Sequence, residues 1–195
     1  MNTFDPNAHS PVVQALLVEP RLNPLDPGQP NRAALTQLKT LDESMFQPSV
    51  VRHPAMAAAC RAALWLYHDY LDEAHTISQD IDTQEGSYWH ALMHRREPDF
   101  SNSKYWFRRV GVHPIFEPLC MAAAELAREA SSQAAFLRIQ KKWDAFAFVD
   151  FCEASLHGKA PCEMLCRQIQ RHEWELLFDY CYRRAGSVSD QSQVS

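Results

Sequence analysis

Apolar residues recur at intervals of three and four along most of the chain, the spacing that places them on one face of a helix. The pattern is clear in residues 31–41, where Asn31 is a candidate helix cap, and again in residues 54–71, where a proline occupies the expected first helical position. No window shows the period-two alternation that is typical of a half-buried strand. The pattern therefore predicts an all-α fold.

Breaks in the pattern divide residues 31–186 into six to seven helices of a single compact bundle. Gly86-Ser87 reads as a break followed by a helix cap, and Pro98 should end the helix before it, because the residue preceding proline disfavours the helical conformation. Residues 1–30 are rich in proline and are predicted to form an irregular N-terminal arm; residues 187–195 are predicted to be a disordered polar tail. The expected helices are 31–41, 54–71, 88–96, 102–111, 114–130, 132–158 and 161–186.

The bulk composition is that of a soluble globular protein, with 46% hydrophobic and 22% charged residues. No apolar run reaches the length of a membrane span, and the first residues lack the basic and apolar regions of a secretory signal. We therefore expect a cytoplasmic protein without membrane association. The six cysteines fall in helix-like segments, which predicts buried, reduced thiols.

Positive charge is concentrated in one block of an otherwise acidic chain. The formal net charge is −5, yet residues 86–114 hold five basic side chains against two acidic ones. Overall acidity argues against a general nucleic-acid binder. We expect the block to hold a small anionic or sugar-like ligand, since arginine forks suit carboxylate and phosphate groups; ordinary surface ion pairs are the alternative. The candidate substrate-binding residues are Arg95, Arg96, Lys104, Tyr105, Trp106, Arg108, Arg109 and His113.

Five of the nine histidines fall between positions 68 and 113. His68, Asp72 and His75 would share one face if the first long helix extends that far, and His90, His94 and Glu97 would share a face of the next. Helices joined by a short connection commonly pack side by side, which would bring the two stripes together. Imidazole and carboxylate groups suit zinc, iron or manganese. The candidate ligands of a divalent metal are His68, Asp72, His75, His90 and His94.

The same residues allow acid–base chemistry without a metal, because imidazole titrates near neutral pH. His90, His94, His68 and Glu73 are then the candidate catalytic groups. The zinc-protease pattern His-Glu-x-x-His is absent, with Ala91 in the place of its glutamate. Histidines that merely cap helices or pair with nearby carboxylates are the plain structural alternative.

The block also resembles a known signature. Residues 86–114 read GSYWHALMHRREPDFSNSKYWFRRVGVHP, and residues 66–75 read LYHDYLDEAH. Together they cover about a quarter of the chain and resemble a family of small helical proteins of bacteria and fungi that has no established activity. The resemblance implies that function lies in this block, and it implies no particular reaction.

The sequence thus favours an enzyme that acts on a small anionic or polyhydroxylated substrate through a histidine–carboxylate centre. A non-catalytic binding module for an anionic ligand or a protein partner is the first alternative. A single-stranded RNA binder that stacks bases on aromatic side chains, and a purely structural bundle, are further alternatives. The sequence does not indicate an oligomeric state.

Overall fold

The computed structural model describes residues 4–186, and in that range the chain forms only helices and connecting loops. The predicted all-α class is confirmed, although the helices are more numerous than the six to seven expected. The predicted tail, residues 187–195, lies outside the described residues. The α-helices are α1 (Pro11–Leu17), α2 (Leu35–Lys39), α3 (Pro54–Tyr67), α4 (Leu71–Gln79), α5 (Gln84–Arg96), α6 (Phe100–Val110), α7 (Phe116–Leu126), α8 (Ala135–Ile139), α9 (Ala145–Leu156) and α10 (Glu163–Gly186). Three short 3-10 helices, η1 (Pro6–Ala8), η2 (Glu43–Phe46) and η3 (Ser132–Ala134), complete them.

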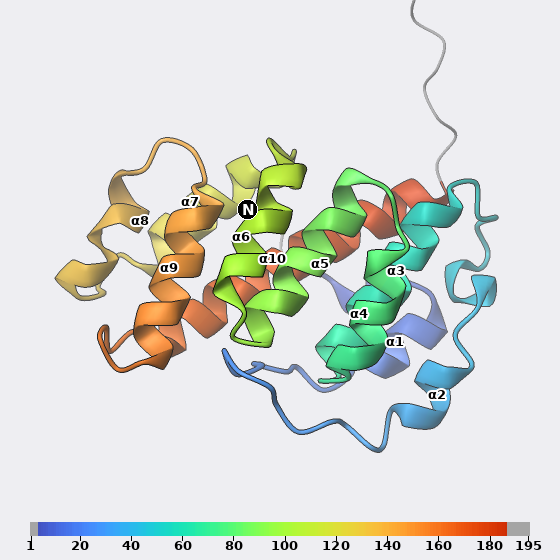
Figure 1. Cartoon of the computed structure of the whole chain (residues 1–195). Coiled ribbons are helices and arrows are strands. Elements are labelled where there is room, and N and C mark those ends of the chain that lie inside the picture. Colours follow the sequence, from blue (N-terminus) through green and yellow to red (C-terminus); the bar gives the residue numbers. More distant parts are fainter. Residues whose placement is uncertain (1–3, 187–195) are drawn as a thin grey trace, which may run out of the picture.

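The long helix α10 forms the back of the molecule and packs against α3, α7 and α9 (Figure 1). Its buried residues fall in a broad stripe of two neighbouring positions per turn, such as Trp174 with Glu173 and Phe178 with Leu177. A stripe of this width lets one helix cover several others. In front of it, α5 lies between α4 and α6 and also contacts α3, so α5 is enclosed on nearly every side.

The first long helix is shorter than predicted, and this changes which side chains meet. α3 ends at Tyr67, and Asp69 adopts a left-handed conformation with φ of 63° before α4 begins. An aspartate tolerates this conformation better than most residues. Here its carboxylate also accepts hydrogen bonds from Arg21 and Asn23 of the N-terminal segment. The expected continuous helix through residues 68–71 was therefore wrong.

Helix α5 begins earlier than predicted. Thr83, rather than Ser87, caps it by accepting a hydrogen bond from the Gly86 backbone N–H. Gly86 lies inside the helix because the preceding loop passes very close to it. A Cβ atom at this position would lie 2.1 Å from the Ile81 carbonyl oxygen. The glycine marks a close backbone approach and not a helix break.

Two other predicted segments differ from the structure. Residues 1–30 are not irregular throughout, because α1 contributes buried Val13 and Leu16 to the core. The helix expected over residues 132–158 is divided into η3, α8 and α9, and Asp144 caps α9 through hydrogen bonds from two backbone N–H groups. The six cysteines are buried and free, which agrees with the prediction. Among the described helices, none has both the length and the apolarity needed to cross a bilayer.

Candidate metal centre

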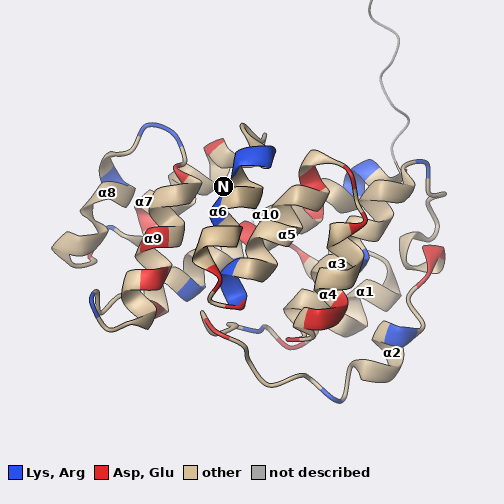
Figure 2. Ribbon diagram, viewed as in Figure 1, with Lys and Arg blue, Asp and Glu red and all other residues tan. Residues whose placement is uncertain are grey.

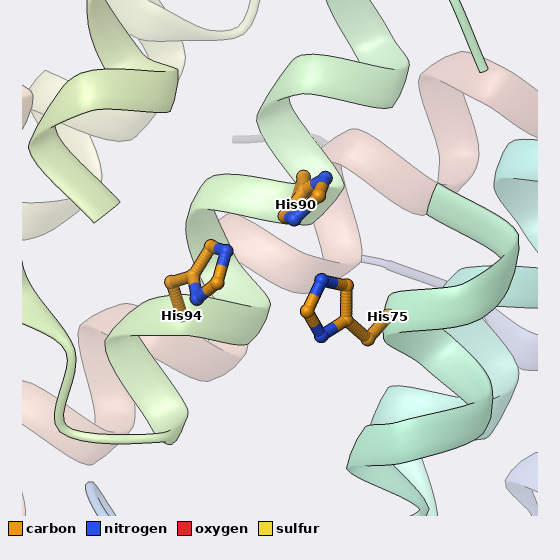
Figure 3. A group of neighbouring side chains, drawn as sticks. All are labelled: His75, His90 and His94. Atoms are coloured by element: carbon orange, nitrogen blue, oxygen red, sulfur yellow. The ribbon is translucent and has the colours of Figure 1, made fainter. Parts of the chain in front are cut away.

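Three histidines from two helices converge at the contact between α4 and α5 (Figure 3). His75 comes from α4, and His90 and His94 come from successive turns of α5. One ring nitrogen from each residue lies within 4.8 Å of the other two. The centroid of the His75 ring is 4.7 Å from that of His90 and 5.1 Å from that of His94. The expected meeting of two imidazole-bearing helices therefore occurs, with His75 as the contribution of α4.

The local fold explains this convergence. Positions 90 and 94 are one turn apart, so their rings stack on the same face of α5, 4.7 Å apart and 21° from parallel. Residues 80–83 make a short connection, which returns α5 alongside α4. The His75 ring then meets the pair edge-on.

Helix α6 holds the His90 ring from the other side. The indole of Trp106 stacks on this imidazole with a centroid distance of 4.0 Å and an angle of 15°. The guanidinium of Arg109 lies 5.2 Å from the Trp106 ring centroid, and its side chain is about half exposed. The His90 ring is therefore fixed in one orientation, and a cation and an aromatic face lie beside it.

The two ring nitrogens of His94 have different surroundings. Nε2 lies 3.2 Å from the side-chain nitrogen of Asn102, on α6. Nδ1 lies 3.3 Å from a carboxylate oxygen of Glu97 but in a geometry that does not form a hydrogen bond. Nδ1 of His90 is likewise buried without a hydrogen-bond partner. Two buried imidazole nitrogens at one site thus lack the partner that such atoms normally have.

Burial favours the neutral form of the two α5 histidines, and carboxylates lie nearby. Burial, together with the other two histidines, lowers the pKa of His90 from 6.5 to about 3, and burial lowers the pKa of His94 as well. The carboxyl group of Glu97 has a raised pKa, because it is desolvated and because Asp72 and Asp99 lie nearby. Uncharged imidazoles beside carboxylates favour a cation over an anion.

The residues present fit a divalent transition metal. Zinc–imidazole bonds of about 2.0–2.1 Å place the nitrogens of a tetrahedral site roughly 3.4 Å apart. The present limit of 4.8 Å is wider by little more than 1 Å. The His75 side chain is about one-third exposed, so its ring is less confined than the two buried rings of α5. With the Asn102 amide turned so that its oxygen accepts from Nε2–H, Asn102 would orient a His94 bound to metal through Nδ1, as partners of metal-bound histidines commonly do.

Two other predicted ligands do not join this cluster. His68 was expected to lie on the same face as His75, but the helix ends at Tyr67 and the chain turns at Asp69. The His68 ring instead packs against the N-terminal segment, with Nδ1 3.1 Å from the Asn31 side-chain nitrogen. His68 is therefore not part of the group that could hold a metal ion, and its catalytic role stays a prediction. Asp72 is outside the three-histidine group and contributes only to the negative field at Glu97.

The predicted anion-binding residues Arg95 and Arg96 lie inside the protein and not at the histidine cluster. Arg95 is 1% exposed and forms an ion pair of 2.6 Å with Glu173 of α10. Arg96 is equally buried and pairs with Asp69 at 2.5 Å. Both guanidinium groups therefore neutralise buried carboxylates inside the protein. Both also line a small cavity with Asn23, Gln170 and Trp174, and two nitrogens of the Arg95 guanidinium have no hydrogen-bond partner, so their ligand-binding role stays a prediction.

The remaining predicted site residues are spread over several surfaces. Lys104 pairs with Asp150 of α9, and Arg108 lies over the Phe146 ring. His113 is fully buried, 3.9 Å from Glu85, so it belongs to the core. Glu73 lines an open groove beside α4, next to Asp72 and Trp65. Only Tyr105, Trp106 and Arg109 lie near the histidines, because Tyr105 contacts Trp106 edge-on and Trp106 stacks on His90.

Acidic and basic side chains lie on different helices around the histidine cluster. The first turn of α4 is acidic and the last turn of α6 is basic, as Figure 2 shows. The sequence analysis did not identify Asn102 as a site residue. It lies on α6, the helix that directly follows α5, and this closeness along the chain could have suggested a contact with His94. The sequence analysis placed Glu97 on the same helical face as His90 and His94 but did not include it among the site residues.

Comparisons of the chain with protein-family models, with curated proteins and with solved structures found no match. The resemblance of residues 86–114 to a family of small helical proteins therefore stays a prediction. The function must be argued from the geometry of the three histidines and their surroundings.

Proposed function

We propose that the protein is a metal-dependent enzyme that binds one divalent ion of the zinc type through His75, His90 and His94. One observation carries the proposal: three imidazoles converge within 4.8 Å, and two of them, those of His90 and His94, hold buried nitrogens without hydrogen-bond partners. Zinc accepts neutral imidazole ligands, and buried nitrogens that lack a hydrogen bond gain most from a metal bond.

The ligand set favours catalysis over a structural role. Structural zinc sites are closed by four protein ligands, whereas catalytic sites keep one position for water or substrate. Three histidines leave that position open here. A bound ion supplies a Lewis acid and lowers the pKa of its water. Glu97, whose carboxylate lies 3.3 Å from His94 Nδ1, would be the candidate base for such a water.

The substrate is proposed to be a small anionic or polyhydroxylated molecule. Trp106 and Tyr105 offer aromatic faces, and Arg109 offers a half-exposed cation on the same wall of the site. Aromatic faces stack on sugar rings, and a guanidinium binds carboxylate or phosphate. Of the five predicted cations, we propose that Arg109 is the one that binds the substrate. Arg95, Arg96 and Lys104 have carboxylate partners elsewhere, and Arg108 lies over Phe146.

The first test is zinc binding by protein purified without a histidine tag. Titration calorimetry with zinc alone should give one site per chain, and His90→Ala or His94→Ala should weaken binding at least a hundredfold. His172→Ala is the matched control, since His172 is also placed three residues before a glutamate, at 3.4 Å. Cobalt substitution should give the intense visible absorption of a tetrahedral ion. Unchanged zinc affinity in the His90 variant would exclude the centre.

The second test separates metal binding from catalysis. Glu97→Gln should retain zinc and lose turnover of small ester or phosphoester substrates by at least a hundredfold, because the base is removed while the ligands remain. If zinc binds in one equivalent but no turnover is measured in the wild-type protein, the non-catalytic alternative replaces the enzyme.

A further inference from the structure

A concave surface lies between α7 and residues 140–143, away from the histidine cluster. It is a groove of about 850 Å³. Phe116, Cys120 and Met121 of α7 form its apolar side, and Gln140, Lys142 and Trp143 lie on the other. It shares no residue with the candidate metal centre. Small-molecule sites commonly have volumes of roughly 300–1,000 Å³ and mostly apolar linings.

The groove exposes apolar side chains that have no cover in the folded chain. Met121 is 59% exposed and Val112, on the loop that follows α6, is 87% exposed. Single exposed apolar residues are common on proteins, but here they are combined with a concave surface. An apolar body seated in the groove would remove both from water.

The charges at the rim favour an anionic group. Lys141 and Lys142 are exposed, and neither has an ion pair or a hydrogen bond with a described residue. Most other cations of the described chain have a carboxylate or an aromatic partner. Glu117 is the one acidic residue in the lining, so the groove keeps a net positive charge.

Two further hydrogen-bond donors belong to lining residues. The indole nitrogen of Trp143 and the side-chain nitrogen of Gln140 are buried and have no acceptor among the described residues. Trp143 itself is 6% exposed. Buried donors usually have acceptors, so each of these two donors is open to an oxygen of water or of a ligand that the chain itself does not supply. Lysine ammonium groups and these N–H groups together suit a carboxylate.

We propose that this groove binds a free, single-chain amphipathic carboxylate, of the type of a medium-chain fatty acid. The acyl chain lies against Phe116, Cys120 and Met121, and the carboxylate faces Lys141 and Lys142. This site is independent of the metal centre, so either proposal can fail without the other.

Titration calorimetry with octanoate, decanoate and decanol tests the proposal on the full chain. Decanoate should bind saturably at one site. Affinity should rise roughly threefold to fourfold per added methylene, as expected for burial of an apolar chain. Decanol, which lacks the charge, should bind at least fivefold more weakly. Absence of saturable decanoate binding at millimolar concentration would overturn the proposal.

Two variants locate the site. The double substitution Lys141→Ala/Lys142→Ala should weaken decanoate roughly fivefold to tenfold, since each exposed charge contact contributes modestly. Lys159→Ala, an exposed lysine outside the groove, is the matched control. Met121→Glu should abolish binding by placing a negative charge on the apolar wall. Equal effects of the lysine variants, or self-association of the chain that Met121→Glu disrupts, would contradict a fatty-acid site.

Discussion

The buried ion pair between Arg95 and Glu173 gives the sharpest test of how this fold is held together. Glu173 is fully buried and accepts hydrogen bonds from the Tyr88 hydroxyl at 2.8 Å and from Arg95 at 2.6 Å. Glu173→Gln keeps the size of the side chain and an acceptor for Tyr88. It removes the negative charge and replaces one acceptor oxygen with an NH2 donor, and therefore leaves the Arg95 cation buried without a counter-ion.

The expected cost is large. Removing one partner of a buried pair destabilises proteins by about 3–5 kcal/mol, whereas exposed pairs contribute about 0–1 kcal/mol. For a chain of 195 residues, a loss of that size lowers the melting temperature by roughly 10 °C. Glu125→Gln, in the exposed pair with Arg128, is the matched control and should cost less than about 1 kcal/mol.

Urea denaturation followed by circular dichroism measures these values. The double substitution Arg95→Met/Glu173→Gln should be more stable than the sum of the single effects implies, because it leaves no charge buried and unpaired. If Glu173→Gln costs no more than Glu125→Gln, the guanidinium is not held as described. Arg95 would then be free to serve a ligand, as the sequence first suggested.

Three further predictions concern other parts of the molecule. Gly86→Ala should destabilise the protein by about 1–3 kcal/mol, measured by urea denaturation, because the new Cβ would overlap the Ile81 carbonyl oxygen; a neutral or stabilising effect would refute this contact. Burial, with a smaller contribution from the Arg21 charge, lowers the pKa of His68 to about 4, so the unfolded chain binds more protons than the folded one between about pH 6.5 and 4. Stability should therefore fall as the pH falls through this window, by up to about 3 kcal/mol, and less steeply in His68→Gln; equal slopes would contradict the burial of this ring. Trp106→Leu should weaken zinc binding roughly tenfold in calorimetry without loss of helical signal, because the indole orients His90; an unchanged affinity would mean that the stack has no such role.

Local patterns predicted the helical class and the pairing of His90 with His94, because both depend on residues within a few positions of each other. The contribution of His75 followed from the short connection between α4 and α5. The failure at His68 has a non-local cause. Asp69 ends the helical path in a left-handed conformation, and its carboxylate is bound by Arg21 and Arg96, which lie 48 and 27 residues away. The spacing of apolar residues in 54–75 could not predict that contact, because both arginines lie outside this segment.

Charge counting failed for a similar reason. The excess of positive charge in residues 86–114 suggested an anion site, but the partner of Arg95 lies 78 residues along the chain in α10. The net charge of residues 86–114 includes these cations but leaves out the distant carboxylates that neutralise them. Arg109 differs because its nearest carboxylate, on Asp82, is fully exposed and 3.7 Å away, a pair that water and salt weaken.

The partners of the polar side chains on α5 support a bound cation at the histidine cluster. Almost every side chain from Glu85 to Arg96 is buried, which is costly for a helix with so many polar groups. Each charged group on it has an opposite charge or a histidine nearby: Glu85 has His113, Arg95 has Glu173, and Arg96 has Asp69. His90 has no hydrogen bond or ion pair with a described residue; its neighbours are two imidazoles and an indole. Because the fold provides partners for the other charged side chains of this helix, a ligand from outside the chain is the simplest partner for the imidazoles.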